Sequence, residues 1–267
     1  MRGTDVATTK RAFATAHEIA RRLQAQGARA VVLVGSYAHG RRHYASDIDL
    51  HVIGKRGDHI LERYGGYLIS ISRGTADDAR RGFRDPFAVG KDIPGWRHAV
   101  ILVDPQRIAR KLRAEARRWH WGLIKDKADR EVAADITHVA ENVQKLLGLL
   151  SVGQVMAAAV QRSVIAFRLP GILAVHHRIL YESENNYVEL VARRMGQPWT
   201  RYQRKALGIQ AESLAATSEA TLALYVLAIA EVRPLLDRRQ RSVVGGACDL
   251  IRQRFGNLKS VQDEGHP

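Results

Sequence analysis

Residues 31–53 read VVLVGSYAHGRRHYASDIDLHVI, and this stretch decides the fold. The β-branched run VVLV predicts a short buried strand that ends at Gly35. DIDLHVI, which starts at Asp47, predicts the next strand. Because side chains alternate across a strand, Asp47 and Asp49 leave the same face. Two like charges side by side are unfavourable unless a cation lies between them, so the pattern predicts a divalent metal site.

The loop between the two strands has the residues of a phosphate site. Gly35 and Ser36 end the first strand where a helix can begin, and Gly40 keeps the next turn open. Backbone N–H groups at such a turn, together with the Ser36 hydroxyl, can hold phosphate oxygens. Arg41 and Arg42 in the same loop either reach a triphosphate or are ordinary loop charges. A phosphate site beside a carboxylate pair is typical of proteins that bind Mg-nucleotide.

Gly35-Ser36, Gly40 and Ser46-Asp47-Ile48-Asp49-Leu50 resemble the G-S-x-x-x-G…S-D-I-D-L signature of the DNA polymerase beta-like nucleotidyltransferase superfamily. The resemblance implies a small mixed sheet with flanking helices. It also implies that one or two Mg²⁺ ions activate an acceptor hydroxyl and neutralise charge on the phosphates. The resemblance assigns Asp47 and Asp49 as catalytic metal ligands and Gly35 and Ser36 as residues that hold the nucleotide phosphates. Ser46 of the signature, with Arg41 and Arg42 of the same loop under the first of their two interpretations, completes the predicted nucleotide-binding set.

The next predicted strand, Tyr67–Arg73, departs from the family pattern. Relatives place a third carboxylate there, facing the Asp pair, whereas this chain has Ser70. A hydroxyl binds a metal-bound water but neither accepts a proton near neutral pH nor contributes charge. Either another residue supplies the acid, or transfer activity is weak or lost. The candidate substitutes, none of which is selected by its spacing, are Asp77, Asp78, Asp85, Glu182 and Glu184.

Two further features of this half have alternative interpretations. His51, two residues beyond Asp49, is either a proton acceptor or a rim residue bonded to backbone. The basic helix expected at about Gln106–Trp121 either binds RNA or is a solvated connection. The other elements expected in this half are a helix from Thr8 or Thr9 to Gln26, a short helix at Ile60–Tyr64, a capped helix at Thr75–Phe83, a lid-like loop at residues 83–96, a strand at Ala99–Val103, and a helix start at Asp104-Pro105.

From roughly Lys127 the strand signals vanish, and apolar residues recur at helical spacing. Helices are expected at about Gln154–Arg168, Ile172–Met195, Glu212–Leu236 and Ala247–Phe255. The fold class is therefore α+β, with a nucleotide- and Mg-binding domain at 1–124 and an all-helical domain at 125–267 that binds the acceptor or a partner. This layout resembles the kanamycin- and streptomycin-type adenylyltransferases. We do not expect a second metal site at His176-His177 and Glu182-x-Glu184, because neighbours and i,i+2 pairs on a helix do not face each other.

Composition fits a cytoplasmic protein. The chain has 267 residues, with 42 Lys and Arg against 27 Asp and Glu, a net charge of +15. Such a charge attracts polyanions, including nucleotides, RNA and acidic protein faces, and repels cationic small molecules. The single Cys248 excludes an internal disulfide. The N-terminus lacks the apolar core of a signal peptide, and the most apolar stretch, Leu222–Val232, is too short to span a bilayer, so no membrane partner is expected.

These observations predict a Mg-dependent nucleotidyltransferase that moves a nucleoside monophosphate, AMP from ATP, to an acceptor hydroxyl and releases pyrophosphate. The positive charge disfavours an aminoglycoside acceptor and leaves a neutral drug, a protein side chain or an RNA end. The alternative, favoured by Ser70, is a nucleotide-binding regulatory module of the antitoxin type without catalysis. Relatives sometimes build the site across a dimer, and both oligomeric states stay open.

Overall fold

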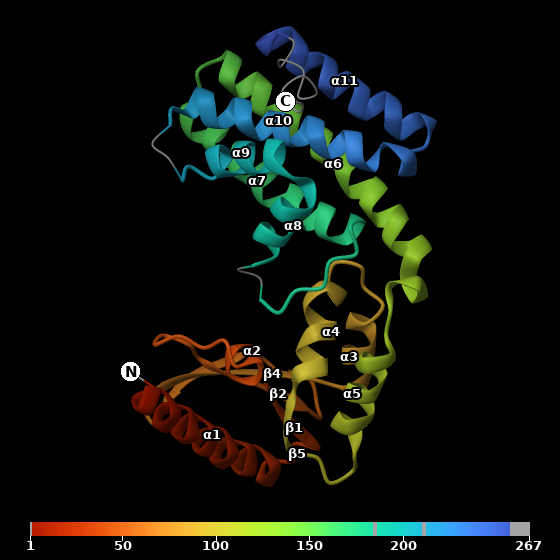
Figure 1. The fold of residues 1–267 in the computed structure, drawn as a ribbon. Coiled ribbons are helices and arrows are strands. Elements are labelled where there is room, and N and C mark those ends of the chain that lie inside the picture. The colour runs from red at the N-terminus through yellow and green to blue at the C-terminus, as the bar shows by residue number, and fades with distance from the viewer. Residues whose placement is uncertain (1, 184–185, 210–211, 257–267) are drawn as a thin grey trace. The chain divides into compact units, whose positions relative to one another are not determined.

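The computed structural model describes residues 2–183, 186–209 and 212–256 (Figure 1). The chain forms two compact units. The sheet unit contains Met1–Leu123 together with Leu180–Glu184, and the helical unit contains Ile124–Ile179 and Asn185–Pro267. The short segment Leu180–Glu184 thus packs with a domain that ends almost sixty residues earlier. Hydrophobic periodicity carries no signal for such a return.

The sheet unit is built on a five-stranded sheet with the order β3-β4-β2-β1-β5. β2 and β4 are parallel, and the other neighbouring pairs are antiparallel, so the sheet is mixed, as predicted. The strands are β1 (Ala30–Val34), β2 (Ile48–Ile53), β3 (Ile60–Tyr64), β4 (Tyr67–Gly74) and β5 (Val100–Val103).

The helix predicted at Ile60–Tyr64 was wrong, because this segment is strand β3. β3 pairs with β4 from Tyr64↔Tyr67 onward. The two connecting residues, Gly65 and Gly66, have φ of +59° and +87°. Two positive φ values in a two-residue loop give the turn that matches the twist of a hairpin, and glycine adopts them without strain.

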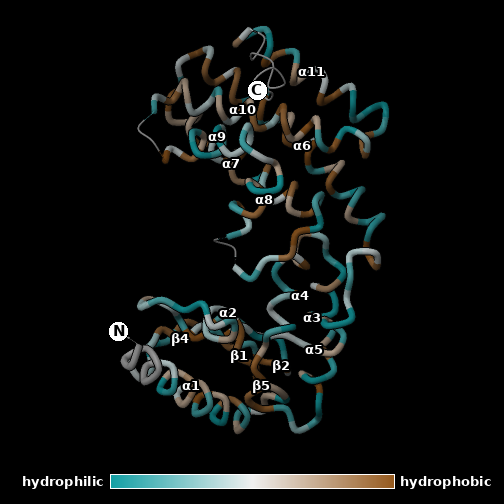
Figure 2. The backbone as a smooth tube through the Cα atoms, in the orientation of Figure 1, coloured by the Kyte–Doolittle hydropathy of each residue, from teal (hydrophilic) through white to brown (hydrophobic). Residues whose placement is uncertain are grey.

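The two faces of the sheet differ in chemistry. One face carries large apolar side chains such as Leu33, Leu50 and Ile71, each at most 1% exposed, which pack against Ile19 and its neighbours on α1 (Arg2–Ala25). Figure 1 shows α1 along the sheet, and Figure 2 shows hydrophobic colour on β1 and β5. Burying each such side chain stabilises the fold by about 1.5–3 kcal/mol. The opposite face carries Asp49 and Ser70, and apolar burial therefore fixes which way these polar groups point.

Helices α3 (Ala76–Gly82) and α4 (Val89–His98) follow β4. Thr75 and Asp78 form the capping box of α3, as predicted. The lid-like loop predicted at residues 83–96 was wrong, because α4 runs through Pro94. Proline lacks the N–H that would bond the carbonyl four residues earlier, that of Gly90. The Gly90 carbonyl accepts instead from the backbone N–H of Tyr181 at 2.7 Å, and this bond ties the returning segment to α4.

Helix α5 (Ile108–Arg118) begins later than predicted. The Asp104 carboxylate accepts from the N–H groups of Ala109 and Arg110, at 3.1 and 2.9 Å, so its capping role is confirmed although the helix does not start at Pro105. Trp119 is 6% exposed, and its indole N–H donates to the Phe83 carbonyl at 2.8 Å. A buried indole offers no face for base stacking, which removes one support for RNA binding by this helix.

The helical unit is an all-helical bundle, as predicted. Its α-helices are α6 (Lys125–Ser151), α7 (Val155–His176), α8 (Tyr187–Met195), α9 (Gln197–Ala206), α10 (Leu214–Val232) and α11 (Arg238–Phe255). The break predicted at Leu169-Pro170-Gly171 was wrong, because α7 continues through it. The last helix starts earlier than Ala247, since Asp237 caps a helix that begins at Arg238 and forms a capping box with Gln240 in its first turn.

Two helices of this unit are long and apolar enough to cross a membrane by length and composition, Val155–His176 and Leu214–Leu235. The apolar stretch Leu222–Val232 was expected to be too short to span a bilayer, but it belongs to a longer apolar helical segment, Leu214–Leu235. Half or more of each apolar window is buried within the bundle, 50% and 56% respectively. Core helices of packed bundles meet the same two criteria, so this is weak evidence for a membrane span.

Candidate active site

The Gly-Ser turn and the carboxylate of β2 meet because β1 and β2 are antiparallel. Val34, the last residue of β1, pairs with Asp49, so the first residue of α2 (Gly35–His39) lies against its side chain. Gly35 has φ +69°, and a Cβ at this position would lie 2.1 Å from Asp49 Oδ2. No larger residue leaves room for the carboxylate there. The motif glycine is thus required both by its backbone conformation and by the space that Asp49 occupies.

Ser36 presents an unsatisfied hydroxyl at the same turn. Its backbone carbonyl accepts from the N–H groups of Gly40 and Arg41. Its Oγ is buried and has no hydrogen-bond partner among the described residues. A buried hydroxyl without a partner costs about 1–3 kcal/mol, so a ligand oxygen at this position would be favourable. This fits the predicted contact of Ser36 with a phosphate.

The Asp49 carboxylate lacks the positive charge that its position demands. Burial, followed by the charge of Asp47, raises its pKa from 3.8 to about 6, while the Ser70 hydroxyl and the charges of Lys91 and His59 act in the opposite direction. A divalent cation would reverse this balance, since a bound cation favours the ionised carboxylate. Carboxylate oxygens are the ligands that Mg²⁺ prefers. The two aspartates therefore fit the metal that the sequence predicts.

Ser70 lies at the position predicted for it. In the parallel β2–β4 pair it is opposite Asp49, and its hydroxyl hydrogen-bonds to the Asp49 carboxylate. Ser70 Oγ also lies 3.0 Å from His59 Nε2. A serine that donates to Asp49 accepts from the imidazole, so His59, Ser70 and Asp49 form one hydrogen-bonded chain. Sequence reasoning missed His59, because the segment after it was taken for a helix and not for the partner strand of β4.

A pocket with a volume of about 570 Å³ opens on this face of the sheet unit. Gly35, Asp49 and Ser70 line it, together with groups that the sequence did not indicate, His59, Lys91 and Trp96 among them. Five predicted site residues are absent from its lining, namely Ser36, Arg41, Arg42, Ser46 and Asp47. The predicted residues therefore divide into a pocket set and a set around the adjoining loop.

The loop set has mixed roles. The Ser46 hydroxyl accepts from the N–H of His43 at 2.8 Å, so it closes the turn that presents Asp47. Arg41 Nε lies 3.0 Å from Glu182 Oε2, an ion pair inside the sheet unit. The charge of Arg42 acts on the hydroxyl of Tyr37. Ser46, Arg41 and Arg42 therefore each interact with another group of the protein.

The candidate substitute acids have different surroundings. Asp78 lines the pocket but is held by Arg56, Arg81 and Thr75. Glu182 lines the pocket through the returning segment. Two others are outside the lining: Asp77 pairs with Arg80, and Asp85 accepts from the N–H groups of Phe87 and Ala88. The last candidate, Glu184, lies outside the described residues.

His51 also lines the pocket, and its ring is held from two sides. Its Nδ1 lies 2.7 Å from Ser72 Oγ, and its ring meets that of Trp96 edge to face, with centroids 5.8 Å apart. Burial lowers the pKa of His51, so the ring is neutral at pH 7. The bond expected to backbone is therefore made to a side chain.

Comparison with known proteins identifies the domain that carries this pocket. Residues 16–81 match the family described as "Nucleotidyltransferase domain". No curated protein matches the chain in sequence. Among solved structures, a nucleotidyltransferase-like protein from Exiguobacterium sibiricum 255-15 has 12% identity and a TM-score of 0.48, covering 90% of this chain and 78% of its own. The sequence match, and not this likeness, identifies the domain.

Proposed function

We propose that this chain, whose residues 16–81 match a nucleotidyltransferase domain, transfers a nucleoside monophosphate to a hydroxyl group in a Mg²⁺-dependent reaction. The donor is an NTP, with ATP as the proposed choice. The acceptor oxygen forms a bond to the α-phosphorus, and the bond from that phosphorus to the β-phosphate oxygen breaks, which releases pyrophosphate.

The proposal assigns a task to each group of the turn and the pocket. Asp47 and Asp49 would hold the metal, which would supply positive charge beside the phosphates and the acceptor hydroxyl. Ser36 donates its unpaired hydroxyl to a phosphate oxygen, and Gly35 leaves the space in which Asp49 approaches. Lys91, whose charge already acts on Asp49 across the pocket, adds attraction for the anionic donor.

The observation that carries the proposal is the pairing of a buried, charge-deficient carboxylate with a glycine turn. A structural carboxylate is normally surrounded by donors and cations that lower its pKa. At Asp49 the pKa is instead raised to about 6. Such a group destabilises the metal-free fold, and a site that binds a cation during function explains why it is there.

The test is pyrophosphate release from each of the four NTPs with Mg²⁺ and a mixed pool of hydroxyl acceptors. Wild-type protein is compared with the double variant Asp47→Asn/Asp49→Asn, whose folding is checked by circular dichroism. We expect release by the wild type alone and fastest with ATP. Equal release by both proteins would show that the activity does not depend on this site.

A second function has its own supporting observation. Ser70 occupies the register position opposite Asp49, where relatives carry an acid, and a serine brings no charge to the site. The alternative is a regulatory module that binds nucleotide without transferring it. Saturable Mg-nucleotide binding with no pyrophosphate release, across the whole acceptor pool, would favour this alternative over transfer.

For the acceptor, the net charge of the protein excludes some chemical classes but does not select one. The net charge of +15 disfavours polycationic small molecules and is compatible with an RNA end, a protein side chain or a neutral compound in the cytoplasm. Supplying each class separately in the same pyrophosphate assay distinguishes them. The class whose omission removes the release contains the acceptor.

A further inference from the structure

Beside the carboxylate pair, the sheet unit holds a second group of metal-ligand atoms. His39 at the end of α2, His98 at the end of α4 and Glu182 in the returning segment present ligand atoms that all lie within 4.8 Å of one another. Glu182 Oε1 is 4.0 Å from His39 Nδ1 and 3.9 Å from His98 Nε2. Two imidazoles and one carboxylate, drawn from three distant parts of the chain, therefore converge on one point.

One of these ligand atoms is buried and unsatisfied. The His39 side chain is 3% exposed, and its Nδ1 has no hydrogen-bond partner among the described residues. A polar atom in this position costs free energy unless something binds it.

The two oxygens of Glu182 have different surroundings. Oε1 faces the two histidines, while Oε2 lies 3.0 Å from Arg41 Nε. The contact of Oε2 with Arg41 is an ion pair, and a charged partner at the second oxygen of a ligating carboxylate helps to orient the first. The charge of Arg41 is already paired with that oxygen, which reduces its repulsion of a cation at Oε1.

Glu182 is brought to this point by the packing of its neighbour. Tyr181 donates its N–H to the Gly90 carbonyl, and its ring lies so close that a Cβ on Gly90 would come within 2.4 Å of it. The segment is thus attached to α4 independently of any metal. A ligand that is positioned before binding loses less entropy when the metal binds.

We propose that His39, His98 and Glu182 bind one Zn²⁺ ion. Two histidines and a glutamate form a typical three-residue zinc set, which leaves a fourth position for water or a substrate group. Bonds of about 2.0–2.2 Å place tetrahedral ligand atoms about 3.4 Å apart, so the two separations from Glu182 Oε1, 4.0 and 3.9 Å, need to shorten by about half an ångström. Because His39 and Glu182 also line the pocket, the zinc would form part of its wall.

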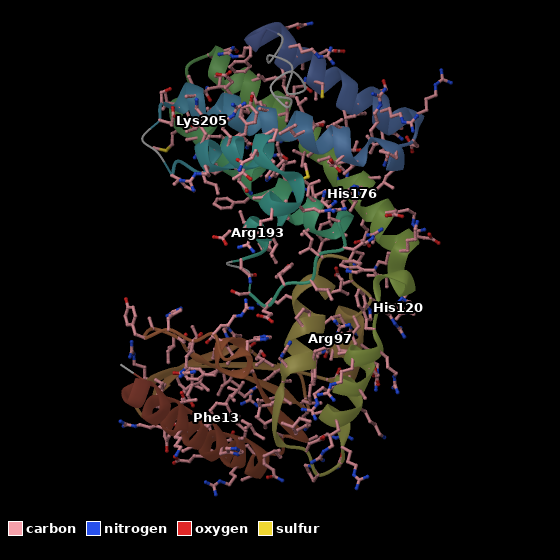
Figure 3. All side chains as sticks on the ribbon, viewed as in Figure 1. Phe13, Arg97, His120, His176, Arg193 and Lys205 are labelled. Atoms are coloured by element: carbon pink, nitrogen blue, oxygen red, sulfur yellow. The ribbon has the colours of Figure 1, made fainter. Side chains whose placement is uncertain are left out.

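A second histidine cluster, in the helical unit, is the competing site. His176, His177 and Glu231 also lie within 4.8 Å, and the two rings are in contact although we expected helix neighbours to diverge (Figure 3 labels His176). There His177 Nε2 is already 3.2 Å from Met195 Sδ, and the charge of Arg194 acts on both rings. Because His177 Nε2 already has a contact and Arg194 would repel a metal cation, this cluster is the weaker ligand set.

The test measures zinc itself and needs no turnover. Chelator-treated, full-length protein is titrated with Zn²⁺ in a calorimeter without nucleotide, and bound zinc is counted by elemental analysis. The Asp47→Asn/Asp49→Asn background removes the other carboxylate site. We expect one zinc per chain in this background, and an affinity at least about tenfold lower in His98→Asn and in Glu182→Gln. Because no nucleotide is present, failure of transfer leaves this result unchanged.

Matched controls keep the result specific. His98 is 51% exposed on its side chain, so its replacement is a surface change that leaves folding intact. His138→Asn, at an exposed histidine 4.0 Å from Asp135, is expected to leave the affinity unchanged. Zinc retained in His98→Asn but lost in His177→Asn would move the site to the helical unit. No zinc in any protein, or equal loss in the His138 control, would overturn the proposal.

Discussion

Two walls of the same pocket carry an aspartate each, and the chain surrounds the two residues in opposite ways. On the α3 wall, Asp78 forms the capping box of α3 with Thr75 and pairs with Arg56 and Arg81, so its negative charge is compensated by groups of the protein itself. On the β2 wall, Asp49 is desolvated next to Asp47 and receives one serine hydrogen bond. A carboxylate whose partners outweigh its burial stabilises the fold, whereas one whose burial outweighs the attraction of Lys91 and His59 is available for a metal.

The largest difference between the walls should appear in catalysis. Asp49→Asn removes a metal ligand, and we expect the transfer rate to fall by at least about 10³-fold. Asp78→Asn keeps the size of the side chain, removes charge from the α3 wall, and should change the rate by less than about tenfold. The measurement is pyrophosphate release at saturating Mg²⁺ and NTP. A similar fall in both variants would abolish the distinction between the walls.

The glycines beside the two aspartates give the next difference. A Cβ on Gly35 would lie 2.1 Å from Asp49 Oδ2, whereas a Cβ on Gly74 would lie 3.5 Å from Asp78 Cβ, an ordinary contact. We therefore expect Gly35→Ala to displace Asp49 and reduce Mg-nucleotide affinity by at least about tenfold, and Gly74→Ala to leave it nearly unchanged. Calorimetric titration with Mg-nucleotide measures both.

Gly35 also has a positive φ, which by itself strains alanine by about 1–2 kcal/mol. Gly153→Ala separates this strain from the clash, since Gly153 has φ +70° and no atom within 4 Å of the added Cβ. It should lower the free energy of unfolding by a similar amount and leave nucleotide affinity unchanged. An affinity loss in Gly153→Ala as large as in Gly35→Ala would mean that global destabilisation, and not the Asp49 contact, explains the effect.

Stability should change in opposite directions at the two walls. The pKa of Asp49 is higher in the folded state, about 6, than the 3.8 of the unfolded chain. The folded state therefore binds this proton more tightly, and the contribution to stability that is present below pH 3.8 is lost as the pH rises through 6. Asp49→Asn should raise the free energy of unfolding at pH 7.5 by about 2 kcal/mol, after a discount for solvent screening, and by much less at pH 4.

Asp78→Ala is the opposite case, because it removes a capping box as well as two ion pairs. We expect it to lower the free energy of unfolding by about 1–2 kcal/mol, most of it from the cap. Urea unfolding in the presence of a chelator, at pH 7.5 and at pH 4, measures both variants under one protocol. Destabilisation by Asp49→Asn at pH 7.5 would show that the carboxylate has a compensating partner in the fold.

The β2 wall could be predicted from the sequence because its information is local. Gly35, Ser36, Asp47 and Asp49 lie within fifteen residues, and strand alternation alone assigns the two aspartates a direction. Ser70 followed from the same alternation, and the parallel β2–β4 register places it opposite Asp49.

The rest of the pocket depends on contacts between distant segments. Glu182 is held at the sheet unit by its neighbour Tyr181, whose N–H bonds the Gly90 carbonyl that Pro94 leaves without its helical partner. His59 lies beside Ser70 because the segment after it is strand β3 of a hairpin, and the sequence had been interpreted as a helix there. A proline usually ends a helix, and a Gly-Gly pair follows a helix or joins two strands. The local sequence does not distinguish these cases, because the hydrogen bonds that decide between them come from distant segments.

Ser70→Ala gives the smallest expected effect and the most direct information on the β2 wall. The Ser70 hydrogen bond lowers the pKa of Asp49, so its removal should raise that pKa further above 6. Protons compete with Mg²⁺ for the carboxylate, and the variant should therefore bind Mg²⁺ a few-fold more weakly at pH 6. At pH 8, where Asp49 is ionised in both proteins, the two affinities should converge. Titrating Mg²⁺ across this range separates the two explanations for a weaker site. A deficit that persists unchanged at pH 8 would mean that Ser70 contacts the metal or its water directly, whereas a deficit that vanishes would mean that it acts only through the protonation of Asp49.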